Sequence, residues 1–200
     1  SVTLRPEGTA PIVRSVIENK LLQQGQALKI WYAGPYFRYE RPQKGRLRQF
    51  HQYGAELIGS ANPESDAETI LLANAVITSL GIKDYKFLLN TLGSSGSRKA
   101  YRDALVEYLS ARKNELSEDS RRRLEKNPLR VLDSKDKNDI EIVKNAPLIL
   151  DYLDEESSAH FERVKELLEE SGMTYEIAPK LVRGLDYYNH TVFEFQHEAL

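Results

Sequence analysis

The chain has no cysteine, and it has only one methionine and one tryptophan in 200 residues. The absence of cysteine excludes a disulfide framework, a zinc site with cysteine ligands and a thiol nucleophile. No apolar run approaches the ~20 residues that a helix needs to cross a bilayer, and the first residues lack the pattern of a signal peptide. We therefore expect a cytoplasmic protein with no membrane contact.

A strong excess of one charge is also absent, because 28 Lys and Arg stand against 30 Asp and Glu. The net charge of −2 excludes a uniformly basic nucleic-acid binder but leaves room for a local basic patch. Charge is uneven along the chain, since residues 98–139 carry a net +3 and residues 147–176 carry a net −7. The histidines show no spacing typical of metal ligands, so we predict no metal site and assign each histidine to the surface or to local packing. These residues are His51, His160, His190 and His197.

The common nucleotide-binding and hydrolase motifs are missing as well. The sequence contains no G-x-x-x-x-G-K-[ST], G-x-G-x-x-G, H-E-x-x-H or G-x-S-x-G. Residues 92–97 contain glycines without the spacing of a P-loop, and we interpret them as a linker. A nucleotide would therefore have to bind on a sheet, through arginine side chains.

Hydrophobic periodicity predicts an antiparallel α+β domain that is interrupted by a mostly helical stretch. Apolar stripes predict helices over residues 10–24, 62–81, 98–114, 120–126, 136–144 and 155–170. Aromatic and β-branched runs predict strands over residues 29–40, 49–58, 85–92, 175–178 and 191–196. We expect the strand-containing residues 1–96 and 172–200 to form one domain and residues 97–171 to form an insertion into it.

The first predicted helix has clear start and stop signals. Thr9 is the expected N-cap, Pro11 lies in the first turn, and Gly25 follows the last turn. The apolar stripe, which we expect to face the core, consists of Val13, Val16, Ile17 and Leu21.

The second strand of a long predicted hairpin carries polar residues between apolar ones. With a period of two, Gln52, Gly54 and Glu56 share a face. Tyr36, Arg38 and Glu40 on the first strand are likewise in phase. A glycine between two polar side chains leaves room for a ligand to approach the backbone. An ordinary exposed face with cross-strand pairs is the alternative, and periodicity alone does not decide between the two.

Two further segments carry unusual chemistry. The loop between the hairpin strands holds four cations and no acid, a combination that suits a phosphate, although a solvated loop tip is the alternative. These cations are Arg41, Lys44, Arg46 and Arg48. Near the end of the chain, residues 181–191 combine Arg183 and Asp186 with the adjacent tyrosines Tyr187 and Tyr188. Adjacent side chains point to opposite sides, so we expect one tyrosine in the core and the other in a pocket.

These segments resemble motifs of histidyl-tRNA synthetases, which are class II aminoacyl-tRNA synthetases. Residues 37–52 resemble the motif 2 strand–loop–strand, residues 181–188 (LVRGLDYY) resemble a peptide peculiar to the family, and residues 4–9 (LRPEGT) resemble its amino-acid-binding loop. The resemblance implies an antiparallel class II sheet of six strands, flanked by helices, of which this chain holds the middle. It implies that residues 1–96 and 172–200 are part of the catalytic core. Residues 97–171 would be the helical insertion, which in the family lies near the tRNA acceptor stem.

The resemblance also implies a two-step reaction. L-histidine would be activated with ATP, accompanied by Mg²⁺, to histidyl-adenylate, and the histidyl group would pass to the 3′ end of tRNA(His). The full-length enzyme would be a homodimer. The sequence lacks an initiator Met, motif 1, motif 3 and the anticodon-binding domain, so we expect a piece of a longer enzyme that need not be active alone.

Site residues follow from the same match. The arginines that would stabilise charge on the α-phosphate are Arg38 and Arg183, and Arg38, Glu40 and Arg46 would lie around the ATP. Glu56 and Tyr188 would read the imidazole, while Glu7, Thr9 and Gln52 would lie near the amino group. The full histidine set implied by the resemblance is Glu7, Gly8, Thr9, Arg38, Gln52, Glu56, Arg183, Tyr187 and Tyr188.

Two other classes of function compete with the ligase. One is a non-catalytic paralogue, either the histidine-sensing regulatory subunit of an ATP phosphoribosyltransferase or an uncharged-tRNA sensor within a kinase. Such relatives tend to lose the arginines or the residues that recognise the imidazole. In this sequence all of these residues are present: Arg38, Gln52, Glu56, Arg183 and Tyr188. The other class is an interaction module without a small ligand, for which the three motifs would have no purpose.

Overall fold

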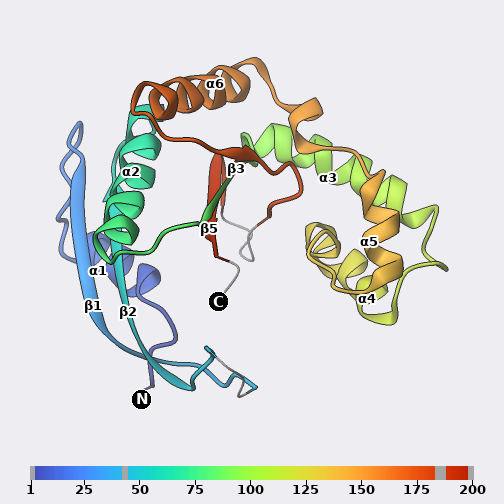
Figure 1. The fold of residues 1–200 in the computed structure, drawn as a ribbon, viewed down its shortest axis with the longest axis horizontal. Helices are drawn as coiled ribbons and strands as arrows, with labels where there is room; N and C mark the ends of the chain where they lie inside the picture. Colours follow the sequence, from blue (N-terminus) through green and yellow to red (C-terminus); the bar gives the residue numbers. More distant parts are fainter. Residues whose placement is uncertain (1–2, 42–44, 183–187, 198–200) are drawn as a thin grey trace. The chain divides into compact units, whose positions relative to one another are not determined.

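The computed structural model describes residues 3–41, 45–182 and 188–197, and these residues form an α+β fold (Figure 1). The chain divides into two compact units, of which the first ends at Val76 and the second begins at Ile77. Among the described residues, no helix is both long and apolar enough to cross a membrane.

The first unit is built on a long antiparallel hairpin. Its elements are α1 (Thr9–Glu18), β1 (Leu28–Phe37), β2 (Gln49–Ile58) and most of α2 (Pro63–Ser79), whose last residues belong to the second unit. The register pairs Tyr32 with Gly54, Gly34 with Gln52 and Ile30 with Glu56. Because side chains alternate along a strand, one face of the hairpin carries Tyr32, Gln52, Gly54 and Glu56 together. The shared face predicted for the polar residues of β2 is therefore confirmed.

The second unit contains a three-stranded mixed sheet in the order β4 (Glu176–Ile177), β3 (Lys86–Thr91), β5 (Thr191–Gln196). β3 pairs parallel with β4 and antiparallel with β5. The described strands thus form a two-stranded and a three-stranded sheet, with one parallel pair, where the resemblance implied six antiparallel strands. The α+β class itself is confirmed.

The helices of the second unit are mostly those of the predicted helical stretch. They are α3 (Ser95–Ser110), α4 (Glu118–Lys126), η1 (Pro128–Val131), α5 (Lys137–Lys144), η2 (Ile149–Tyr152) and α6 (Glu155–Glu170). The apolar faces of α3, α4, η1, α5 and η2 meet in one cluster of buried side chains, which supplies the burial that stabilises short helices. The cluster consists of Tyr101, Leu105, Leu109, Leu116, Leu124, Val131, Val143, Ala146 and Ile149.

A buried carboxylate joins α4 to α5. Asp139 accepts hydrogen bonds from the backbone and hydroxyl of Ser117 and from the hydroxyls of Ser120 and Ser134, at 2.6–2.9 Å. Burial alone would raise the pKa of Asp139, but the hydrogen bonds from the three serines outweigh it and hold the pKa below its usual value. The Asp139 carboxylate is therefore ionised, and its hydrogen bonds form a polar tether between α4 and α5.

A second carboxylate joins the N-termini of α3 and α6. Asp154 caps α6 by accepting from the Ser157 amide at 2.8 Å, and it also accepts from the hydroxyls of Ser94 and Ser97. Ser94 in turn caps α3 by accepting from the Ser97 amide at 3.1 Å. The prediction of a linker over residues 92–97 is wrong, because these serines start a helix.

Other predicted boundaries had mixed outcomes. β2, β5 and α6 begin and end at the predicted residues. The first helix is shorter than predicted, since α1 ends at Glu18 and Lys20 takes a φ of 51°, which no helix continues. The N-cap is Gly8 rather than Thr9, and of the predicted stripe only Val16 is buried.

Candidate functional site

Three side chains from three elements of the first unit meet on the polar face of the hairpin. Glu56 Oε1 on β2 accepts hydrogen bonds of 2.8 Å from Thr9 Oγ1, at the start of α1, and from the hydroxyl of Tyr32 on β1. The two hydroxyl oxygens are 3.4 Å apart, and each gives its single proton to the carboxylate. Thr9 is not the N-cap of α1. Its hydroxyl instead links the start of this helix to β2.

Two glycines accommodate the ring of Tyr32. A Cβ atom on Gly8 would lie 2.1 Å from Tyr32 Cε2, and one on Gly54 would lie 2.4 Å from Tyr32 Cζ. Such distances are far inside van der Waals contact, so any larger residue at either position would displace the ring. The prediction that Gly54 leaves room for a ligand is therefore wrong, because the room is filled by Tyr32.

Glu7 and Gln52, which we expect near the amino group of the ligand, also lie in the first unit. Their hydrogen bonding differs. Both carboxylate oxygens of Glu7 accept from the Ala10 amide, at 3.1 and 3.2 Å, so Glu7 supplies the cap that Gly8 lacks. Gln52 Oε1 is buried and has no hydrogen-bond partner in the part of the chain that the structure describes. A buried amide oxygen without a donor is costly, and a bound ammonium or N–H group would satisfy it.

Two arginines are held on the polar face of the hairpin by hydrogen bonds from their Nε atoms. Arg38 Nε donates to the Pro6 carbonyl at 2.8 Å, and its guanidinium lies 5.0 Å from the centre of the Phe50 ring. Arg5 Nε donates to the Pro35 carbonyl at 3.0 Å, and its guanidinium lies 4.8 Å from the centre of the Tyr36 ring. These contacts set the plane of each guanidinium, a geometry that suits planar recognition of carboxylate or phosphate oxygens.

The basic loop is partly neutralised from within the chain. Arg46 Nη1 lies 3.6 Å from a carboxylate oxygen of Glu40, and Arg48 stacks on the Tyr39 ring with its guanidinium 4.8 Å from the ring centre. Arg41 is exposed, and Lys44 lies outside the described residues. Glu40, which lies between the end of β1 and the loop, therefore supplies the negative charge that the loop itself lacks.

The candidates of the second unit are only partly described. The Tyr188 carbonyl accepts a hydrogen bond from Arg98, and its side chain packs against the buried cluster of Leu92, Val182 and Val192. Tyr188 thus has a contact to the core. Arg183 and Tyr187 lie outside the described residues.

Tyr32 and Arg5 were not predicted as site residues. Tyr32 is in phase with Tyr36 and Arg38 and lies opposite Gly54, and an aromatic residue across from a strand glycine is a readable cross-strand pattern. Arg5 is part of the LRPEGT segment, but its charge alone does not show that it reaches β1.

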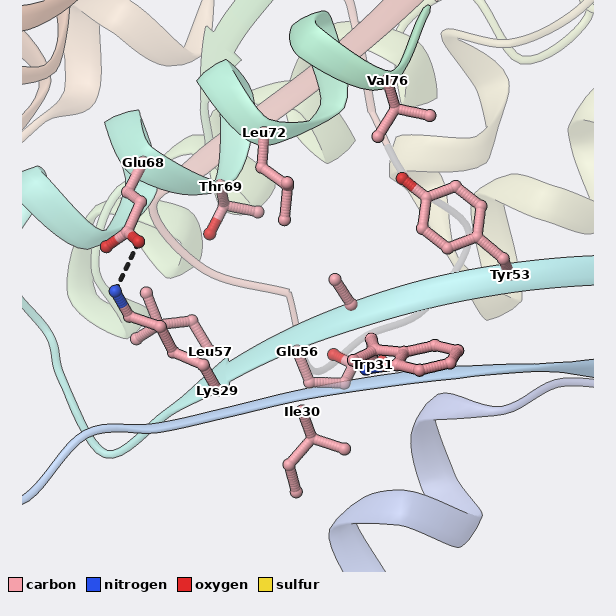
Figure 2. Close-up of a pocket in the computed structure, with 11 residues that line it drawn as sticks. Lys29, Ile30, Trp31, Tyr53, Glu56, Leu57, Glu68, Thr69, Leu72 and Val76 are labelled. Atoms are coloured by element: carbon pink, nitrogen blue, oxygen red, sulfur yellow. Dashed lines mark hydrogen bonds and ion pairs between the residues drawn. The ribbon is translucent and has the colours of Figure 1, made fainter. Parts of the chain in front are cut away.

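The opposite face of the hairpin has different chemistry. Between this face and α2 lies a pocket of about 350 Å³, with a Lys29–Glu68 ion pair on one side and Trp31, Tyr53 and Leu72 among its lining residues (Figure 2). Glu56 also borders the pocket, but its carboxylate is bonded on the polar face. The polar face, rather than this largely apolar pocket, carries groups that can bind a charged amino acid or nucleotide.

Comparisons with known proteins agree with this geometry. The family model for histidyl-tRNA synthetase matches residues 1–199. Curated histidine--tRNA ligases of Streptococcus pneumoniae and Streptococcus mutans are 60% identical over 196 residues, which are 97% of this chain and 46% of each relative. The chain thus spans about half the length of these curated relatives.

Solved structures give the same result. The structure of apo S. aureus histidyl-tRNA synthetase matches with a TM-score of 0.75 and 42% identity, over 96% of this chain and 44% of that one. A structure from Bacillus halodurans, described as an ATP phosphoribosyltransferase regulatory subunit/histidyl-tRNA synthetase, matches with a TM-score of 0.61 over 98% of this chain and 54% of that one. Its 24% identity shows a shared fold alone. On the match over nearly its whole length and the 60% identity to curated ligases, this chain belongs to the histidyl-tRNA synthetase family.

Proposed function

We propose that this chain carries part of the machinery that activates L-histidine with ATP and transfers the histidyl group to the 3′ end of tRNA(His). The observation that carries the proposal is the polar hairpin face, where a tethered carboxylate, a buried unpaired amide oxygen and a fixed guanidinium lie on one surface. Each of these three groups suits a different part of a histidine molecule: the imidazole, the ammonium and the carboxylate.

Glu56 would read the imidazole. Its second carboxylate oxygen, Oε2, has no partner among the described residues and can accept a ring N–H, while Tyr188 would serve the other ring nitrogen. An apolar amino acid of similar size would leave the carboxylate desolvated and unpaired, so the pair discriminates by polarity rather than by shape. Gln52, with Glu7, Gly8 and Thr9 nearby in the first unit, would receive the ammonium group.

Arg38 would act on the reacting atoms. In the first step an oxygen of the histidine carboxylate attacks the α-phosphorus of ATP, the bond to the bridging oxygen breaks, and pyrophosphate leaves with its electrons. Negative charge builds on the α-phosphate oxygens, and a guanidinium already fixed by Pro6 and Phe50 stabilises it without reorganisation. We assign the same role to Arg183 and place Glu40 and Arg46 around the ATP.

Mg²⁺ would arrive with the triphosphate. The described residues hold no group of three His, Asp or Glu side chains that could form a metal site, and the Glu40 carboxylate is already paired with Arg46. Because Mg²⁺ is commonly held by substrate phosphates and water, the phosphate oxygens of ATP would be its main ligands here.

The tRNA would contact the helical stretch, which we propose as an insertion over residues 97–171 between the core segments 1–96 and 172–200. Arg122, Arg123 and Lys126 of α4, with Arg130 of η1, line a shallow hollow of about 430 Å³. Two acidic side chains offset part of this charge, since Asp119 lies 2.5 Å from Arg123 and Glu118 lies 3.8 Å from Arg122. The remaining positive charge suits the phosphate backbone of an RNA. A homodimer of the full-length enzyme and a cytoplasmic location are further proposals that rest on family membership.

The non-catalytic alternative has less support. Two matched structures whose descriptions name an ATP phosphoribosyltransferase have identities of 24% and 14%, against 60% for curated ligases. Arg38, Gln52 and Glu56, which a histidine sensor could lose in part, are all present.

The test is histidine-dependent exchange of pyrophosphate into ATP by the full-length enzyme, followed by charging of tRNA(His). We expect both activities with L-histidine and neither with L-leucine. Histidine binding without exchange would favour the regulatory alternative, and absence of histidine binding would overturn both.

A further inference from the structure

We propose that Tyr32 is a positioning residue that acts through Glu56 and sets which carboxylate oxygen faces the ligand. The inference rests on the proposed function, because it assigns a role to Tyr32 in reading the imidazole. It adds a residue that the family motifs quoted above do not assign, and it explains why two glycines flank the tyrosine ring.

The hydrogen bonds of Glu56 are asymmetric. Oε1 accepts both the Tyr32 and the Thr9 hydroxyl, at 2.8 Å each, whereas Oε2 has no partner among the residues that the structure describes. Two donors on one oxygen use its two lone pairs and fix the rotation of the carboxylate. The other oxygen is then the acceptor that remains for a ring N–H.

The tyrosine hydroxyl is itself held in place. The Tyr32 ring lies against the Cα atoms of Gly8 and Gly54, which come from the loop before α1 and from the paired strand. The ring therefore cannot swing away without moving backbone on either side. A rigid donor costs little conformational entropy when the ligand binds, which is how a supporting residue increases selectivity.

The hydroxyl also remains a donor throughout the working pH range. Burial, together with the neighbouring Glu56 carboxylate, raises the pKa of Tyr32 to about 12. The phenol stays protonated near neutral pH, so its bond to Glu56 is present in every turnover.

The primary experiment is steady-state pyrophosphate exchange by the full-length enzyme with Tyr32→Phe, which keeps the ring and removes the hydroxyl. We expect the KM for histidine to rise about tenfold, the usual effect of losing a hydrogen bond to a charged group, while kcat and the KM for ATP change less than about twofold. Tyr53→Phe is the matched control, because Tyr53 lies on the opposite face of the same hairpin, and we expect no change.

Histidine analogues methylated on one ring nitrogen show whether Tyr32→Phe alters the position of the Glu56 carboxylate or only weakens the structure in general. Wild-type enzyme should reject the isomer whose methyl group replaces the N–H that faces Glu56. With Tyr32→Phe the preference for histidine over that isomer should fall about tenfold, because the carboxylate is no longer held toward one nitrogen. An unchanged preference, or equal increases in KM for histidine and ATP, would overturn the proposal.

Gly54→Ala is a second variant that keeps the hydroxyl but displaces it. Its added Cβ would lie 2.4 Å from the ring, so the ring must move off Glu56. If Tyr32→Phe fails to fold, Gly54→Ala should still raise the KM for histidine selectively, and a wild-type KM in a folded Gly54→Ala enzyme would contradict the proposal. Wild-type enzyme without any histidine-dependent exchange would instead overturn the proposed function itself.

Discussion

Asp139 and Ser120 are both fully buried, and the Ser120 hydroxyl donates to the Asp139 carboxylate at 2.6 Å. Nineteen residues separate them in the sequence, so this bond joins α4 to α5. With the bonds from Ser117 and Ser134, one carboxylate satisfies four donors of the helical stretch. The fold of this stretch therefore depends on a polar tether as well as on its apolar cluster.

Asp139→Ala should destabilise the chain by roughly 2–4 kcal/mol, because buried donors lose their acceptor. Urea unfolding followed by circular dichroism measures the loss. Glu141→Ala on the exposed side of α5 is the control and should change the free energy of unfolding by less than about 0.5 kcal/mol. Equal effects of the two substitutions would show that the tether contributes nothing.

Acid should remove the contribution of Asp139 in the wild-type chain. The folded state holds the pKa of Asp139 below its unfolded value of about 3.9, so the stabilisation is present above that pH and is lost as the pH falls through the folded pKa. We expect the difference in free energy of unfolding between wild type and Asp139→Ala to shrink as the pH is lowered below about 4. A difference that stays constant down to pH 2 would contradict this account.

Arg38→Ala in the full-length enzyme should lower the rate of histidyl-adenylate formation by about 10²–10³, as does the loss of one transition-state donor elsewhere. Arg183→Ala should have an effect of the same size. Pre-steady-state measurement of adenylate formation checks both, and Arg14→Ala, whose side chain is exposed and paired with Glu18, is the control. Near-normal adenylate formation by either site variant would remove that arginine from the reacting centre.

Reversal of charge on α4 should affect the tRNA step alone. Arg122→Glu with Lys126→Glu should raise the KM for tRNA(His) about tenfold at moderate salt and reduce its dependence on salt concentration. Pyrophosphate exchange without tRNA should stay at the wild-type rate. Lys165→Glu on α6 is the matched control, and an equal loss with that variant would argue against a specific role for the α4 surface.

Local signals explain which elements could be predicted from the sequence. The strand over residues 49–58 and the helix over residues 155–170 have strict periodicity and clear ends, and both were confirmed. The end of α1 could not be predicted, because it depends on a positive φ at Lys20, a residue with no special preference for that conformation. The serines of residues 92–97 resembled a linker because the carboxylate that holds the Ser94 hydroxyl, Asp154, is 60 residues away.

The candidate site shows the same division between local and long-range information. The shared face of Gln52 and Glu56 follows from alternation along one strand, and it was predicted. The role of Gly54 was mistaken because its neighbour, Tyr32, is fixed only by the pairing register of the hairpin. Thr9 was predicted as a helix cap from its own neighbourhood, whereas its hydroxyl bonds Glu56, 47 residues away.

The central claim is that the polar hairpin face binds L-histidine through Glu56, and calorimetric titration of the full-length enzyme tests it most directly. Wild-type enzyme should bind L-histidine saturably, histidinol more weakly and leucine not at all. Glu56→Gln should weaken histidine binding at least about tenfold and leave ATP binding within about twofold, while Glu68→Gln on the opposite side of the hairpin should change neither. Equal losses for histidine and ATP in Glu56→Gln, or no histidine binding by the folded wild-type enzyme, would contradict the account.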